Sequence, residues 1–158
     1  MSCYTHDIWY RSPLFWGIFL FDRISKMLVS GGVLGSRGID LFPFLSLRLH
    51  YNYGISWGLF QKLPFGHMLI PTLMAIFLYF FARYTFERQK KCFNVTGETL
   101  VIAGGFSNFV DRVPYGPVTD FIYFHYGAYS FPVFNIADIA ISVGAMIILY
   151  NVLLGNDE

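Results

Sequence analysis

The sequence predicts an all-α membrane protein with four transmembrane helices and a small β element in its first outer loop. Of its 158 residues, 55% are hydrophobic and only 13% are charged, whereas an average soluble domain has roughly 45–50% and 25%. Aromatic residues make up 20% of the chain, which is more apolar bulk than a water-soluble domain of this size can bury. Four apolar stretches also approach the ~20 residues that a bilayer-spanning helix needs.

The expected spans are residues 13–29, 64–82, 98–110 and 134–154. The third is short, but helical continuation through Asp111 and Arg112 would let it reach the headgroup region. Neither a repeat nor a linker divides the chain, so residues 1–158 are expected to form a single integral membrane domain. The segment 83–91 between the second and third spans carries four basic residues. The positive-inside rule places this segment in the cytoplasm, with both termini on the same side.

The first outer loop contains an alternating segment at residues 46–53. Leu47, Leu49, Tyr51 and Tyr53 share one face of it, and polar side chains share the other. This is the pattern of a half-buried strand. We expect a small β element on the outer membrane face, followed by a turn at Gly54 and an apolar segment at residues 55–60.

Ionisable residues inside apolar helices are the most informative feature, because a charge at the bilayer centre costs at least ~2.5–3.5 kcal/mol on insertion scales. In the first helix Asp22 and Lys26 are four residues apart, so they share a face and can neutralise each other. A purely structural ion pair and a functional role are both open. Arg23 points elsewhere on this helix, and we expect it to snorkel to the interface.

The third and fourth predicted helices carry the other polar groups. Gly104, Asn108, Asp111 and Arg112 form one stripe, in which small residues also favour close helix packing. Asn135 and Asp138 open the fourth helix three residues apart, and Asn135 could simply be the N-terminal cap. Asp138 lies a turn deeper, where a capping role is not expected.

Asp120 alone would pass for an ordinary loop aspartate. However, the third helix leaves the membrane and the fourth re-enters it on the same outer side, so Asp120 and Asp138 can meet. Two carboxylates that share a site cannot both ionise, and one can polarise a carbonyl while the other activates water. This is aspartic peptidase chemistry. It requires no cofactor or metal, and the sequence contains neither His-Glu-x-x-His nor Gly-x-Ser-x-Gly.

Five motifs in order resemble those of the prolipoprotein signal peptidases, and the match extends from Asp22 to the fourth helix. The motifs are Asp22-Arg-Ile-Ser-Lys26, Asn52-Tyr-Gly54-Ile-Ser-Trp-Gly58, Asn108-Phe-Val-Asp111-Arg112, Val118-Thr-Asp120-Phe and Phe134-Asn135-Ile-Ala-Asp138. Each motif alone is weakly specific, whereas their order on four suitable spans is specific in combination.

The resemblance implies an aspartic endopeptidase of the bacterial inner membrane, with its active site at the outer face. Its substrates would be diacylglyceryl-modified prolipoproteins, cut just before the lipidated cysteine, and membrane lipid would surround it. The implied roles are catalysis for Asp120 and Asp138, substrate binding for Asn52, Gly54, Asn108, Arg112 and Asn135, and structural support for Asp22, Lys26 and Asp111.

The chain departs from the family pattern at a few positions. Ser56 and Trp57 replace the commoner Ala-Phe, Ser107 precedes Asn108 where Gly or Leu is usual, and Arg23 stands where Gln is frequent. Trp57 could narrow the groove for lipid or peptide. The aromatic stretch 121–131 has no explanation at this level.

Two other function classes remain as alternatives. A small transporter or proton-relay protein could use the same acidic residues. This alternative predicts internal repeats, which the sequence does not contain. A membrane scaffold would use the polar stripes to hold helices together, which does not explain why the acids gather on one side. The net charge of +1 gives no electrostatic footprint for nucleic acid.

Overall fold

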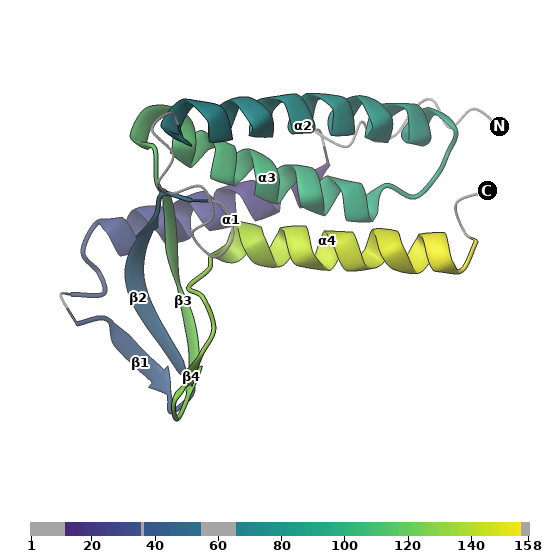
Figure 1. Ribbon diagram of the computed structural model, residues 1–158. Coiled ribbons are helices and arrows are strands. Elements are labelled where there is room, and N and C mark those ends of the chain that lie inside the picture. The colour runs from purple at the N-terminus through teal and green to yellow at the C-terminus, as the bar shows by residue number, and fades with distance from the viewer. Residues whose placement is uncertain (1–11, 36, 55–65, 156–158) are drawn as a thin grey trace.

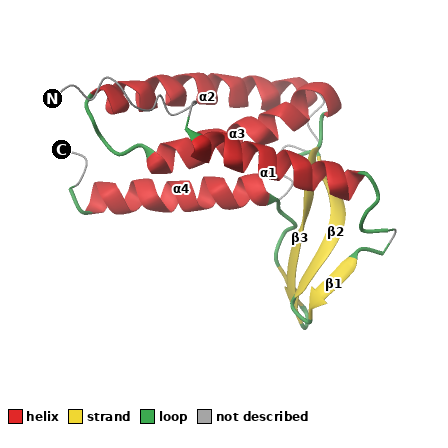
Figure 2. Cartoon of the chain, turned by 180° about the vertical axis from the view of Figure 1, so that it is seen from behind, coloured by secondary structure: helices red, strands yellow, loops and turns green. Residues whose placement is uncertain are grey.

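The computed structural model describes residues 12–35, 37–54 and 66–155. These residues form four helices and four strands, in the order α1 (Pro13–Ser30), β1 (Ile39–Phe42), β2 (Leu45–Asn52), α2 (Gly66–Lys90), α3 (Thr96–Tyr115), β3 (Val118–Tyr126), β4 (Tyr129–Ser130) and α4 (Ile136–Leu153). The helices pack side by side, and the strands project from one end of the bundle (Figures 1 and 2). At that end α1 and α3 finish while α2 and α4 begin (Figure 1).

In the described residues each of the four predicted spans is mostly helical, and α3 continues through Asp111 and Arg112 as expected. The segment 83–91, predicted as a connection, is instead almost entirely the last part of α2, which ends at Lys90. An ion pair fixes this helix end, because Arg88 Nε lies 2.9 Å from Oε1 of Glu98 in the first turn of α3. The predicted apolar segment 55–60 and Trp57 lie outside the described residues.

Two described helical segments, Met68–Lys90 and Ile136–Leu153, are long and apolar enough to cross a membrane. α1 and α3 each carry three charged residues, which lowers their hydropathy. Their charged groups nevertheless lie inside the bundle, with exposed fractions of 0% for Asp22 and 2% for Lys26. Large apolar side chains of α1 such as Phe21 and Met27 face outward. The charged residues of α1 therefore point to its partners and the apolar ones to its surroundings.

The β element is larger than predicted. It is an antiparallel sheet in the order β1-β2-β3-β4, so it draws on two separate loops and not on the first outer loop alone. An all-α description is therefore too narrow. β3 supplies the backbone partners for one side of β2, whose N–H and C=O groups would otherwise need water. This pairing also carries Asp120, which lies opposite His50.

The prediction that the apolar row of β2 is half-buried is wrong for its second half, since Leu49 and Tyr51 are exposed. The register shifts between Leu47 and His50, which breaks the simple alternation. Ser46, on the row expected to be polar and outward, is fully buried. Its hydroxyl donates to Asp40 Oδ1 over 2.6 Å and lies 2.7 Å from Nε2 of His125.

The aromatic stretch 121–131 now has a structural role. Phe121 packs with Val29 and Leu34 in a buried cluster that joins the sheet to the helices. Phe124 stacks between Phe44 and Phe134, at centroid distances of 6.5 and 5.9 Å. Aromatic contacts thus connect β3 to the turn between β1 and β2 and to the residues just before α4.

Glycines allow α3 and α4 to approach closely. A Cβ at Gly104 would overlap the carbonyl oxygen of Ala137 and lie 2.9 Å from Cγ1 of Ile141. One at Gly144 would lie 2.5 Å from the carbonyl oxygen of Gly97. The packing prediction for the glycine stripe is therefore confirmed at Gly104. Any added side chain there must push α4 away from α3.

We expect Gly104→Ala to lower the thermal unfolding midpoint of the detergent-solubilised protein. Overpacking of this kind costs typically ~1–3 kcal/mol, because the new methyl group meets backbone and not a flexible side-chain end. Gly17→Ala is the matched control, since a Cβ at Gly17 meets nothing within 4 Å and alanine is the better helix former. Equal midpoints for the two variants would contradict the close approach.

Candidate active site

The two aspartates predicted to form a pair lie where the sheet meets the helices. Asp120 is the third residue of β3, and Asp138 is in the first turn of α4. Both lie in the part of the chain that returns from α3 to α4, as the sequence suggested. Asp120 has an exposed fraction of only 2%. The Asp120 carboxyl group is therefore removed from water.

Asn135 and Asp138 form a capping box at the start of α4. Asn135 Oδ1 accepts from the backbone N–H of Asp138 over 2.9 Å, and Asp138 Oδ2 accepts from the backbone N–H of Asn135 over 3.2 Å. The expectation that Asp138 has no capping role is wrong, because its position three residues after the N-cap is where a reciprocal cap forms. The box holds the carboxylate and leaves Oδ1 free to face α3.

That second oxygen is held by α3. Asn108 Nδ2 donates to Asp138 Oδ1 over 2.9 Å. The carboxylate therefore accepts one hydrogen bond from its own helix start and one from a neighbouring helix. Both donors are N–H groups that cannot accept a proton, so they leave the carboxylate as the basic group at this position.

Asp120 is held by two side-chain amides. Asn135 Nδ2 donates to Oδ1 over 2.6 Å, and Asn52 Nδ2 donates to Oδ2 over 3.1 Å. Burial, followed by the nearby charge of Asp138, raises the pKa of Asp120 to about 7, against the opposing effect of these amides. A carboxyl with this pKa can keep a proton near neutral pH.

Asn135 is the residue that joins the two aspartates. Its backbone N–H reaches Asp138, and its side-chain amide reaches Asp120. The same amide contacts Asn108 Oδ1 at 3.2 Å and the carbonyl oxygen of Thr119 at 3.4 Å. Asn135 is fully buried. Its contacts fix the positions of both carboxyl groups. Its capping role and its site role coexist.

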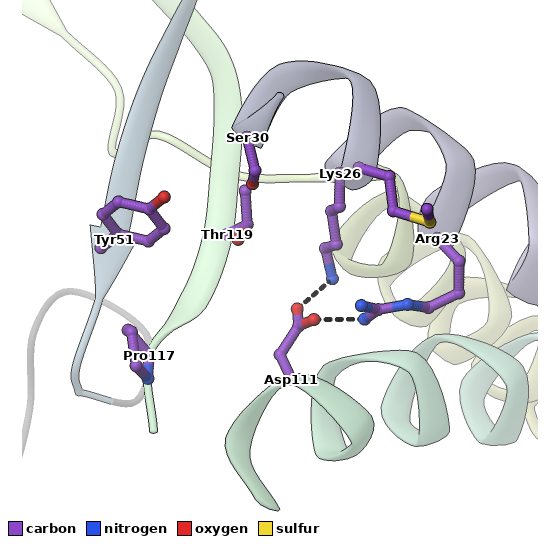
Figure 3. Close-up of a pocket in the computed structure, with 8 residues that line it drawn as sticks. Arg23, Lys26, Ser30, Tyr51, Asp111, Pro117 and Thr119 are labelled. Atoms are coloured by element: carbon purple, nitrogen blue, oxygen red, sulfur yellow. Dashed lines mark hydrogen bonds and ion pairs between the residues drawn. The ribbon is translucent and has the colours of Figure 1, made fainter. Parts of the chain in front are cut away.

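A buried ion-pair cluster lies beside the aspartates and links α1 to α3. Lys26 Nζ lies 2.7 Å from Asp22 Oδ2 and 2.8 Å from Asp111 Oδ2. Arg23 also pairs with Asp111, as Figure 3 shows. The pairing of Asp22 with Lys26 is confirmed, whereas the expectation that Arg23 snorkels to the interface is wrong. Its partner lies on α3 and not on its own helix.

Asp22 extends this cluster to α4. Its Oδ1 accepts from the backbone N–H of Ala137 over 2.9 Å, and its Oδ2 accepts from the hydroxyl of Ser107 over 2.6 Å. An unpaired N–H of the first turn of α4 is thereby satisfied by α1. Asp22 thus fixes the position of the helix start that carries Asp138.

Arg112 and its sequence neighbour Asp111 contact different parts of the site. It donates to the carbonyl oxygens of Gly54 and Gly116, and Asp111 is paired with α1. The Gly54 N–H in turn donates to Asn52 Oδ1 over 3.0 Å, which turns Asn52 Nδ2 toward Asp120. Arg112 therefore holds the end of β2 against α3.

A cavity of about 440 Å³ is lined in part by the ion-pair cluster (Figure 3). The lining residues include neither aspartate of the pair. They come from α1, the end of β2, α3 and the start of β3, and they are Arg23, Lys26, Met27, Ser30, Tyr51, Asp111, Pro117 and Thr119.

All ten predicted site residues thus lie in one connected network at the sheet end of the bundle. Arg23, Ser107 and Thr119 belong to it as well, although the sequence did not place them in the site. The charge of Arg23 inside an apolar helix was the available signal. The described residues contain no group of three or more His, Cys, Asp or Glu that could hold a metal ion.

The sequence is similar to proteins of a known family along most of its length. A family model described as Signal peptidase (SPase) II matches residues 14–154. A lipoprotein signal peptidase of Wigglesworthia glossinidia brevipalpis is 35% identical over 134 residues, which cover 85% of this chain and 88% of that protein. One from Brucella ovis is 36% identical over 152 residues, which cover 95% and 93%.

The fold has a counterpart among solved structures. A bacterial membrane enzyme solved by the in meso method at 2.3 Å resolution aligns with a TM-score of 0.68 and 28% identity, over 90% of this chain and 87% of that chain. A second, at 1.9 Å resolution, gives a TM-score of 0.63. Since the family model covers most of the sequence and relatives above 30% identity align along it, this chain belongs to the signal peptidase II family.

Proposed function

We propose that this protein is an intramembrane aspartic endopeptidase that removes signal peptides from diacylglyceryl-modified prolipoproteins by cleaving before the lipidated cysteine. Its relatives are lipoprotein signal peptidases. The observation that carries the proposal is the pair Asp120 and Asp138, which Asn135 holds together through two hydrogen bonds. A metal is not required for this chemistry, because two coupled carboxyl groups supply both acid and base.

The proposed roles of the two aspartates, Asp120 as the acid and Asp138 as the base, follow from the proton that Asp120 keeps. Asp138, ionised, takes a proton from a water molecule whose oxygen attacks the scissile carbonyl carbon. Asp120, protonated, donates to the carbonyl oxygen as negative charge develops there. In the tetrahedral intermediate the proton on Asp138 passes to the leaving nitrogen, the C–N bond breaks, and Asp120 recovers its proton as the new carboxyl group forms. Asn52, Asn108 and Asn135 hold the two carboxyl groups in place.

The proposed membrane placement has four spans in one integral domain, with the sheet and the aspartates at the outer face. Pairing within the bundle supports it for α1 and α3, because charges that neutralise each other remove most of the insertion cost. α3 has 20 residues, which at ~1.5 Å per residue gives about 30 Å, the thickness of the hydrocarbon core. The basic end of α2 lies at the opposite end from the sheet (Figure 1), as the inner side requires.

Lipid recognition fits the same placement. Asn52, Gly54, Asn108, Arg112 and Asn135 surround the aspartates and form the proposed substrate site. Because the scissile bond precedes a lipid-bearing cysteine, it lies at the depth where acyl chains leave the membrane. A pair of carboxyl groups at the sheet end of the bundle is positioned for such a bond.

Asp120→Asn and Asp138→Asn should each give folded protein that binds the precursor yet cuts it slower by orders of magnitude. Asn is nearly isosteric but cannot exchange the proton. The double variant should be scarcely slower than either single, because the pair acts as a unit. Turnover is measured per folded molecule after detergent extraction.

Asp111→Asn is the comparison for this experiment. Since Asp111 pairs with Arg23 and Lys26, its loss should lower the amount or thermal stability of the protein more than the activity per folded molecule. An active Asp120→Asn variant, together with a folded but inactive Asp111→Asn variant, would move the pair to Asp111 and Asp138.

Reporter fusions test the orientation. A reporter that is active only outside the cytoplasm should be silent when fused near residue 90 and active when fused near residue 126, because the basic segment stays inside. The opposite pattern would reverse the proposed topology.

Cleavage should depend on lipid modification of the substrate cysteine, because each buried methylene of an acyl chain contributes about 0.8 kcal/mol to binding. An unmodified precursor should barely be cut under conditions in which the modified one is processed fully. Gel mobility of the two precursors over time gives the rates. Equal rates would argue for a general signal peptidase without a lipid-reading site.

A further inference from the structure

Lys26 contacts the candidate active site through a neutral residue, and this contact goes beyond structural support. The Lys26 side chain is 2% exposed, and its ammonium group has three acceptors within 2.8 Å. Two are the carboxylates of Asp22 and Asp111, and the third is Oδ1 of Asn108. The contact to Asn108 is a hydrogen bond, whereas the contacts to the two carboxylates are ion pairs.

The contact to Asn108 fixes which way its amide faces. A lysine ammonium can only donate, so it must meet the oxygen of the Asn108 amide and not its nitrogen. Asn135 Nδ2, also a donor, approaches the same oxygen at 3.2 Å. With Oδ1 held by two donors, Nδ2 must turn to the other side, where it donates to Asp138 over 2.9 Å.

The Asn135 contact alone would hold this orientation weakly. Its amide nitrogen is shared among Asn108, Thr119 and Asp120, and the shortest of these contacts, at 2.6 Å, goes to Asp120. A hydrogen bond from an ionised donor is roughly twice as strong as one between neutral groups. Lys26 is therefore the stronger of the two constraints on Asn108.

We propose that Lys26 is a positioning residue, which keeps the amide of Asn108 turned so that an N–H donor, and not a carbonyl oxygen, faces the carboxylate of Asp138. This inference rests on the proposed function of Asp138 as the base. If the Asn108 amide reversed, its oxygen would face Asp138 Oδ1. Two acceptors in contact repel unless the carboxyl group takes up a proton, and a protonated Asp138 cannot activate water.

The positioning effect can be separated from simple charge balance. The charged groups that interact with Asp138 are Asp22 and Lys26 of α1, Arg112 of α3 and Asp120 of β3. Removing Lys26 leaves Asp111 with Arg23, and leaves Asp22 with the donors of Ser107 and Ala137. A second substitution at Asp22 then restores the net charge without restoring the contact to Asn108.

The experiment compares Lys26→Met with Lys26→Met/Asp22→Asn in cleavage of a lipid-modified prolipoprotein, with rates expressed per folded molecule. We expect kcat to fall about 10- to 100-fold in both variants, a part of the ~10²–10⁴-fold that a positioned acid–base group contributes. KM should change by less than about 3-fold, because the other residues of the proposed substrate site, Asn52, Gly54, Arg112 and Asn135, are unchanged. The acid limb of the pH–rate profile should move to higher pH, since the base takes up a proton more readily.

Two further variants complete the test. Lys90→Met removes a partly exposed lysine, whose partner is Glu87, and should leave kcat and the pH profile unchanged. In an Asn108→Ala background, Lys26→Met should cause little additional loss of kcat, because the contact through which it acts is gone.

The outcomes distinguish the two levels of inference. If the unmodified protein does not cut the precursor, the proposed function fails. If the protein is active and Lys26→Met/Asp22→Asn recovers the original kcat and pH profile, Lys26 only balances charge and the positioning role is wrong. Full additivity of Lys26→Met with Asn108→Ala would also overturn it.

Discussion

Pairing of buried charges is the constraint on which this structure depends. A lone charge in an apolar bundle is costly, so α1 and α3 must meet where Asp22, Arg23, Lys26 and Asp111 satisfy one another. The register between the two helices is therefore fixed, because a shift by one turn would break the contacts of Arg23 and Lys26 with Asp111. Asp22 then captures the start of α4 through Ala137. Three helices are fixed by one polar cluster.

Close packing completes what the charges begin. The glycines of α3 and α4 let the two backbones approach until Asn108 on one helix reaches Asp138 on the other. The sheet supplies the remaining partner, because β3 brings Asp120 to the opposite side of Asn135. The site is thus assembled from two strands, a helix start and a helix interior. Each of these elements contributes an amide or a carboxyl group, and three asparagines connect them.

Much of this arrangement could be predicted from the sequence, because it depends on local spacing. Four apolar runs predicted four helices, the i,i+4 spacing predicted the pairing of Asp22 with Lys26, and short connectivity brought Asp120 to Asp138. The partner of Arg23 could not be predicted, since Asp111 lies 88 residues away and only tertiary packing joins them. The pairing of β2 with β3 was missed for the same reason. The burial of Ser46 depends on Asp40 and His125, which no alternation pattern can show.

The double use of the capping box at α4 has a consequence for how the protein fails on heating. Asn135 and Asp138 both begin the helix and hold the site, so fraying of a single helical turn separates the two carboxyl groups. Helix ends open more easily than whole domains, because fewer contacts must break. Inactivation should therefore set in below the temperature at which helical content is lost. The catalytic rate would then measure local order at the start of α4, at temperatures below those that unfold the helical bundle.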